Sequence, residues 1–127
     1  ADEGEARSVK DVIERAYIDG IHGKQNRELA ESGFHPDFSM LVLRKGRLIE
    51  VDLDEWFEMM GGSRNVRSDG SEPAVTHEFH FVDITGSAAV AKCTVCKGGK
   101  LFATDYFSLY KFDGQWKIIS KIFSRGD

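Results

Sequence analysis

Apolar residues recur every three or four positions near the start of the chain, which is the spacing of one buried helical face. This stripe contains Ala6, Val9, Val12, Ile13, Ala16, Tyr17 and Ile21. A short polar helix is predicted at residues 24–32, directly before Gly33, which suits a left-handed C-cap. A third helix is predicted at residues 53–60, because Asp52 can cap its start. All predicted helices therefore lie in the first half of the chain.

Extended segments show a different, alternating pattern. Two short strands are predicted at residues 38–43 and 48–51, joined by a basic turn. Gly98-Gly99 and Asp113-Gly114, which separate later extended runs, are preferred in two-residue hairpin turns, so antiparallel neighbours are expected. The four later strands are predicted at residues 74–84, 88–96, 101–112 and 115–123.

One long segment, residues 61–73, has no periodic apolar pattern and is rich in turn-forming residues. We expect it to be a lid or a connector. Because it lacks apolar anchors, it is also predicted to be the most mobile internal segment.

The resulting order, α-α-β-β-α-β-β-β-β, predicts an α+β fold with three helices on one face of a curved antiparallel sheet. A chain of 127 residues fits one domain, residues 1–127. Tyr106 and Tyr110 alternate with Phe107 and Leu109, so apolar side chains occupy both faces of the late strands. The second face therefore needs a cover, and a homodimer that packs sheet on sheet would supply it.

Composition and charge limit the classes of binding partner that are expected. The chain is 41% hydrophobic and 30% charged, with a net charge of −4, so nucleic acid and anionic membranes are not expected partners. No apolar run approaches the roughly 18 residues that cross a bilayer. The start of the chain shows no secretory signal pattern, and a cytoplasmic location is expected, although a signal removed before Ala1 would leave no trace.

Two cysteines, Cys93 and Cys96, lie three residues apart in a predicted strand. Their side chains should point to opposite faces with α-carbons about 10 Å apart, which excludes a disulfide between them. A zinc site would need two further ligands, and no phosphate-binding, dinucleotide-binding or serine-nucleophile motif occurs. We therefore expect packed thiols in a reducing compartment, no metal and no cofactor.

Three segments carry a family resemblance: Phe34-His35-Pro36-Asp37, Val82 to Gly86 with Ala89 to Lys92, and Asp105 to Leu109 followed by Asp113 to Phe123. They resemble the nuclear transport factor 2-like superfamily, which includes ketosteroid isomerases and SnoaL-like cyclases. Within it, the segments are most similar to a small bacterial family labelled putative lumazine-binding. The resemblance implies a cone-shaped, cystatin-like fold with a ligand pocket between the first helix and the concave face of the sheet. Some proteins with this fold bind ligands without chemistry.

Asp105 occupies the position at which, by the same resemblance, ketosteroid isomerases keep a protonated acid. The alternative is a structural Asp105 that accepts hydrogen bonds from a neighbouring strand or the helices. Its alternating neighbours on the same strand, Ala103, Phe107 and Leu109, offer no cation, so Asp105→Asn is expected to leave the melting temperature unchanged, although Lys121 on the adjacent strand could reach it. The first strand, residues 38–43, lacks the carboxylate base of those isomerases, which makes steroid isomerisation an unexpected activity.

Strand parity and position in the chain predict where the histidine side chains point. His80 shares parity with Val82 and Ile84, so it is expected to point into the cone beside Cys93. His77 has the opposite parity and is expected on the dimer side. A hydrogen-bonded structural histidine is the simpler interpretation of His80. His22, at the end of the first helix, is interpreted as a favourable cation at a helix C-terminus.

The leading hypothesis is a small-molecule-binding protein whose pocket takes a small apolar or aromatic ligand. Two alternatives stay open: a cofactor-independent dehydratase, cyclase or isomerase-type enzyme, and a dimeric protein-interaction module. In the enzyme, His80 would move a proton while Asp105 and Tyr17 stabilise an oxyanion. The predicted pocket residues are Tyr17, Trp56, His80, Asp105 and Phe107.

Overall fold

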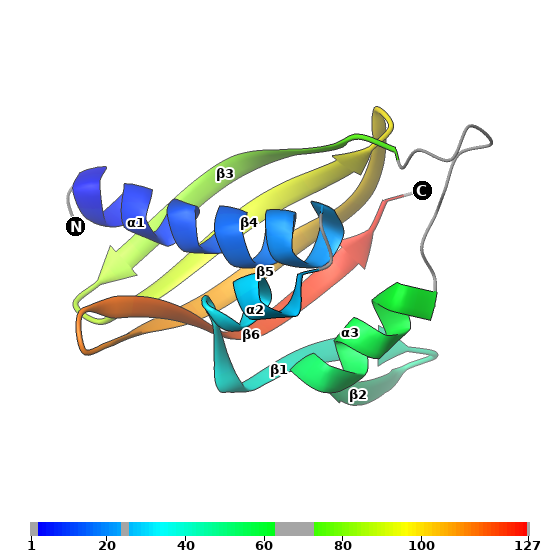
Figure 1. Ribbon diagram of the computed structural model, residues 1–127, viewed down its shortest axis with the longest axis horizontal. Helices are drawn as coiled ribbons and strands as arrows, with labels where there is room; N and C mark the ends of the chain where they lie inside the picture. Colours follow the sequence, from blue (N-terminus) through cyan, green and yellow to red (C-terminus); the bar gives the residue numbers. More distant parts are fainter. Residues whose placement is uncertain (1–2, 24–25, 63–72, 127) are drawn as a thin grey trace.

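Six strands form one curved sheet with the spatial order β2-β1-β6-β5-β4-β3, and the computed structural model describes residues 3–23, 26–62 and 73–126. The elements are α1 (Glu3–Ile13), η1 (Glu14–Gly23), α2 (Arg27–Glu31), β1 (Phe34–Arg44), β2 (Arg47–Asp52), α3 (Leu53–Gly62), β3 (Val75–Thr85), β4 (Ala88–Lys97), β5 (Lys100–Phe112) and β6 (Gln115–Arg125). This order confirms the predicted α+β class (Figure 1). Most of the predicted mobile segment, residues 63–72, lies outside the described residues.

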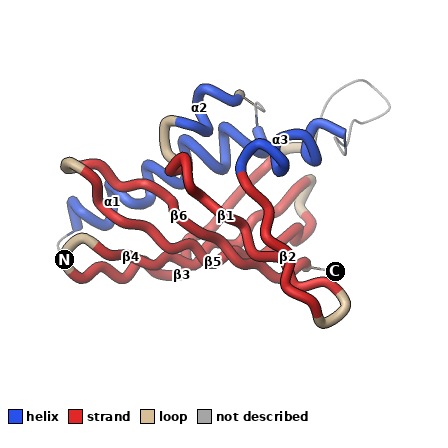
Figure 2. Tube along the Cα trace, turned by 90° about the horizontal axis from the view of Figure 1, so that it is seen from below, coloured by secondary structure: helices blue, strands red, loops and turns tan. Residues whose placement is uncertain are grey.

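The sheet is antiparallel except where β1 runs parallel to β6. The helices gather on one side of the curved sheet, as Figure 2 shows. The first helix is continuous in space, but its second half, η1, is a π-helix rather than an α-helix. That change matters for the site described below.

The predicted hairpin turns are confirmed by their backbone angles. Gly98 and Gly99 have φ values of 58° and 82°, and Asp113 and Gly114 have 48° and 81°. Two successive positive φ angles are what the type I′ turn requires, and its twist matches that of the strands it joins.

A β-bulge in β3 changes which residues face the helices. Phe79 pairs with Cys93 and Phe81 with Lys92, so His80 is the extra residue of the bulged strand. His77 and Phe79 are half-buried before the bulge, and Ile84 is buried after it, so the inward parity switches at His80.

The bulge overturns both expectations drawn from a uniform alternation. His80 is exposed, with its Nε2 2.6 Å from Thr94 Oγ1, and does not point into the cone beside Cys93. His77 lies on the helical side, where its Nε2 is 2.8 Å from Glu14 Oε2, and not on the dimer side.

Aromatic and aliphatic side chains populate the outer face of the sheet. Cys93 is a buried free thiol on the inner side, and Cys96 is a half-buried one. The outer face carries large apolar residues that are between 41% and 51% exposed in this single chain, namely Phe81, Val90, Tyr106, Tyr110 and Ile122.

Candidate functional site

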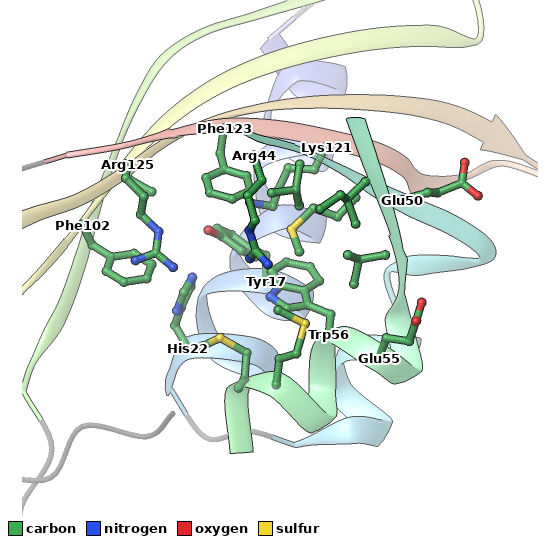
Figure 3. Close-up of a pocket in the computed structure, with 17 residues that line it drawn as sticks. Tyr17, His22, Arg44, Glu50, Glu55, Trp56, Phe102, Lys121, Phe123 and Arg125 are labelled. Atoms are coloured by element: carbon green, nitrogen blue, oxygen red, sulfur yellow. The ribbon is translucent and has the colours of Figure 1, made fainter. Parts of the chain in front are cut away.

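A cavity of about 320 Å³ lies between η1, α3, the β1–β2 hairpin and the ends of β5 and β6 (Figure 3). This volume lies within the range of ligand-sized protein pockets, about 300–1,000 Å³. Tyr17 from η1 and Trp56 from α3 form adjacent parts of its wall, with their ring centroids 5.7 Å apart. Both residues were predicted to line the pocket.

The π-helix η1 brings a second side chain into this wall. Tyr17 and His22 are five residues apart, and their rings meet edge to face with centroids 4.7 Å apart. In an α-helix, residues five apart point about 140° away from each other, because each residue turns by about 100°. A π-helix joins residues five apart by its hydrogen bonds, so the two rings fall on one face.

His22 is buried at 8% exposure, and neither ring nitrogen has a hydrogen-bond partner in the part of the chain that the structure describes. Burial lowers the pKa of His22 well below 6.5, and Lys97, Lys121 and Arg125 lower it further. At neutral pH the ring is therefore uncharged. The prediction that His22 is a cation at a helix terminus is wrong, because the π-helix turns the ring inward.

Beneath Tyr17 lies a buried group of three polar side chains. The Tyr17 hydroxyl donates a 2.5 Å hydrogen bond to Asp105 Oδ2, and Lys121 Nζ donates a 2.8 Å hydrogen bond to Asp105 Oδ1. Asp105 and Lys121 are only 0% and 3% exposed. The arrangement matches the structural interpretation of Asp105, because its carboxylate accepts hydrogen bonds from η1 and from the neighbouring strand β6.

The environment of this group is strongly desolvating. Burial raises the pKa of Tyr17 well above 10.0, and the charge of Asp105 raises it further. Burial also lowers the pKa of Lys121, while Asp105 opposes that shift. The Lys121 ammonium additionally lies 5.2 Å from the Tyr17 ring centroid and 4.2 Å from that of Phe123, both within cation–π range.

Charge is unevenly distributed along the cavity. Two basic groups stack on Phe102: Lys97 Nζ lies 3.9 Å from its ring centroid and the Arg125 guanidinium carbon 4.4 Å. Glu50 and Glu55 lie across the cavity from His22, Phe102 and Arg125 (Figure 3). Basic groups therefore gather at the His22 end and carboxylates at the other end, with Arg44 between them (Figure 3).

The five predicted pocket residues are only partly brought together. Tyr17 and Trp56 line the cavity, whereas Asp105 lies behind Tyr17 and Lys121. Phe107 lies behind Tyr17, with ring centroids 5.0 Å apart, and His80 lies on the opposite face of the sheet. Whether any of the five binds a ligand stays a prediction.

Most of the other lining residues were not predicted, among them His22, Phe102, Lys121 and Arg125. One signal for Lys121 was present in the sequence. A lysine stands in an apolar strand beside a strand that carries Asp105, and the register places the two diagonally, since Lys121 pairs with Phe107. No cluster of three potential metal ligands occurs among the described residues.

Folding stability should fall below neutral pH because of His22. The unfolded chain takes up a proton near pH 6.5, whereas the folded chain resists it, so stability decreases as the pH falls. Between pH 7.5 and 5.5 this group should cost about 1.4 kcal/mol. Urea unfolding at both pH values should show the loss in the wild type but not in His22→Phe. An equal loss of stability in both proteins would show that His22 is not the cause of the pH dependence.

Comparisons with known proteins agree with this architecture. A family model described as "Putative lumazine-binding" matches residues 4–124, and no curated protein matches the chain. None of the helices in the described part of the chain is long and apolar enough to span a membrane.

Solved structures share the whole fold at low sequence identity. An NTF2-like protein of unknown function from Shewanella baltica has a TM-score of 0.81 at 19% identity, covering 100% of this chain and 98% of that chain. One from Silicibacter pomeroyi has a TM-score of 0.75 at 16% identity, covering 96% of each. A de novo designed protein with a curved β-sheet has a TM-score of 0.61 at 11% identity, covering 97% of this chain and 99% of that chain. These similarities show the fold alone, so function must be argued from the cavity.

Proposed function

The chain belongs to the putative lumazine-binding family of nuclear transport factor 2-like proteins, and from this premise we propose that its cavity binds a small, planar, mostly apolar ligand. The observation that carries the proposal is the buried His22 ring, whose two nitrogens have no hydrogen-bond partner among the described residues and which lies beside a mostly apolar wall. A buried polar group without a partner costs free energy. A ligand that supplies the partner recovers that cost.

The shape of the wall supports a flat ligand. Tyr17 and Trp56 are tilted by 35° relative to each other and offer broad apolar surfaces, and Met59 and Met60 from α3 complete the rim. Methionine side chains adapt easily to different ligand shapes. The family description names lumazine, a planar heteroaromatic molecule, which makes it the first compound to test.

Calorimetric titration with lumazine and with 2-naphthamide tests this proposal. At least one of these planar probes should bind saturably. Val42→Phe, which fills the cavity, should abolish binding, whereas Leu43→Phe, the next residue of β1 and 78% exposed, should preserve it. Failure of every planar probe to bind, or unchanged binding in Val42→Phe, would refute the proposal.

The enzyme hypothesis receives no support from the described residues. It required His80 to move a proton beside Tyr17 and Asp105. With His80 on the outer face of the sheet, these three groups do not share a site.

We further propose a single domain that forms a homodimer through the outer face of the sheet. Large apolar residues there, among them Tyr106, Tyr110 and Ile122, are exposed in the single chain, and adjoining exposed apolar side chains are typical of protein–protein contact surfaces. Sedimentation equilibrium should give twice 14.2 kDa for the wild type. Ile122→Lys should give the monomer mass, and Leu48→Lys, at a more exposed apolar site on the β1–β2 hairpin, should not. A monomeric wild type would contradict the proposal.

A cytoplasmic location is proposed as well. The two free thiols, Cys93 and Cys96, support it, because reducing compartments keep cysteines unpaired. Cell fractionation with an antibody to the chain tests this proposal, and recovery outside the cytoplasm would refute it.

A further inference from the structure

The basic end of the cavity restricts the chemical class of the ligand more narrowly than the apolar wall does. His22 and Arg125 both contact the Phe102 ring, with a His22 to Phe102 centroid distance of 5.4 Å and an Arg125 to Phe102 distance of 4.4 Å. Figure 3 shows the Arg125 guanidinium directed toward the His22 ring. The two side chains thus share one corner of the cavity.

Positive charge in this corner is only partly balanced within the described part of the chain. Lys121 is balanced by Asp105, but neither Arg125 nor Lys97 has a carboxylate partner among the described residues. Both instead stack on Phe102. The effect of this charge is visible on Lys97, whose pKa is lowered by burial and by Arg125.

Two kinds of group in the corner therefore lack partners of complementary chemistry. The guanidinium of Arg125 has five donors suited to an acidic oxygen group, and His22 can donate through one ring nitrogen. Glu50 and Glu55 at the opposite end of the cavity disfavour an anion there. An acidic ligand would accordingly bind in one orientation.

We propose that the ligand is a planar aromatic carboxylate whose carboxylate group binds between His22 and Arg125 while its ring lies against Tyr17 and Trp56. This inference rests on the proposed function and specifies its ligand class. The burial of His22 supports it, since a hydrogen bond from a buried donor to a charged group contributes more than one made in water.

Binding of such a ligand should change the pKa of the His22 ring. The charged groups that influence the His22 ring are Lys97 on β4 and Lys121 and Arg125 on β6, all basic, and these keep it neutral in the free protein. A carboxylate beside the ring offsets them and favours the imidazolium. The pKa of His22 therefore rises on binding.

A matched pair of probes tests the inference, namely 2-naphthoate and its uncharged isostere 2-naphthamide. At pH 7 the carboxylate should bind about tenfold more tightly than the amide. Arg125→Gln and His22→Phe should each remove this preference, so that the carboxylate and the amide bind with about equal affinity. Arg47→Gln removes the same charge from an exposed position outside the cavity and should retain the preference.

NMR titration of the histidine ring signals gives a second readout. The pKa of His22 should increase by about one unit in the naphthoate complex, whereas naphthamide should not change it. His35, His77 and His80 serve as internal controls. Because Arg125 is exposed, its variant also tests the site independently of any stability loss in His22→Phe.

The outcomes separate the two proposals. Equal affinity for the carboxylate and the amide, or an unchanged His22 pKa in the naphthoate complex, would overturn the carboxylate site while leaving the cavity as a binding site. Failure of both probes and of lumazine to bind would overturn the proposed function itself.

Discussion

Asp105→Asn is expected to lower the free energy of unfolding at pH 7 by about 3–5 kcal/mol. The substitution preserves volume but removes the negative charge that the Lys121 ammonium contacts at 2.8 Å. Lys121 is 3% exposed, so water cannot replace the lost partner. Urea unfolding measures the loss, and Asp113→Asn, which removes the same charge from an exposed turn, should stay within about 0.5 kcal/mol of the wild type.

Two further measurements sharpen this prediction. The deficit of Asp105→Asn should shrink between pH 7 and pH 10, because the unfolded chain then holds a proton on Lys121 that the folded variant releases. The double variant Asp105→Leu with Lys121→Met should recover most of the stability, since no buried charge is left unpaired. A loss below about 1 kcal/mol in Asp105→Asn would show that the ion pair is not needed for stability.

The sequence-based expectation for this variant was the opposite. It rested on Ala103, Phe107 and Leu109, the inward neighbours of Asp105 on its own strand, none of which is a cation. The partner comes from β6, and an irregularity in the β5–β6 register between Ser108 and Leu109 sets which residues meet. Strand alternation predicts faces, but cross-strand contacts depend on such local irregularities.

The fold itself could be predicted because its signals are local. Apolar period distinguished helix from strand, and Asp113-Gly114 and Gly98-Gly99 encoded hairpin turns through the backbone angles they tolerate. Strand ends differed by only a few residues, the largest extension being at Phe34, where β1 begins four residues before the predicted strand. These errors do not alter the topology.

The site was less predictable because two departures from regular geometry determine it. The bulge at His80 reversed the inward face within β3, and the π-helix turned His22 toward Tyr17. Neither departure has a composition signature as specific as a glycine in a tight turn. Both bulges and π-helical turns occur frequently near functional sites, so a failure of regular periodicity at this place is itself informative.

Trp56→Ala is expected to cost about 3–5 kcal/mol, the range for removing a large aromatic side chain from a core. Trp56 is 5% exposed and is one of the residues through which α3 packs on the sheet. Its ring stacks on Phe38 at 5.8 Å, meets Phe34 edge to face at 5.7 Å, and lies 5.1 Å from Lys121 Nζ. The truncation therefore removes packing and one wall of the cavity together.

The comparison with Trp56→Phe separates these two consequences. Phenylalanine keeps a ring against Phe34 and Phe38, so its loss of stability should be clearly smaller than that of alanine, while the cavity grows on the side that faces Tyr17. Circular dichroism during urea unfolding measures the free energy of unfolding. Calorimetry with 2-naphthamide measures how the altered cavity wall changes the affinity for a ligand. If Trp56→Ala lost less than about 1.5 kcal/mol, α3 would be a loosely attached lid rather than part of the core, because a side chain that anchors a helix cannot be removed at so low a cost.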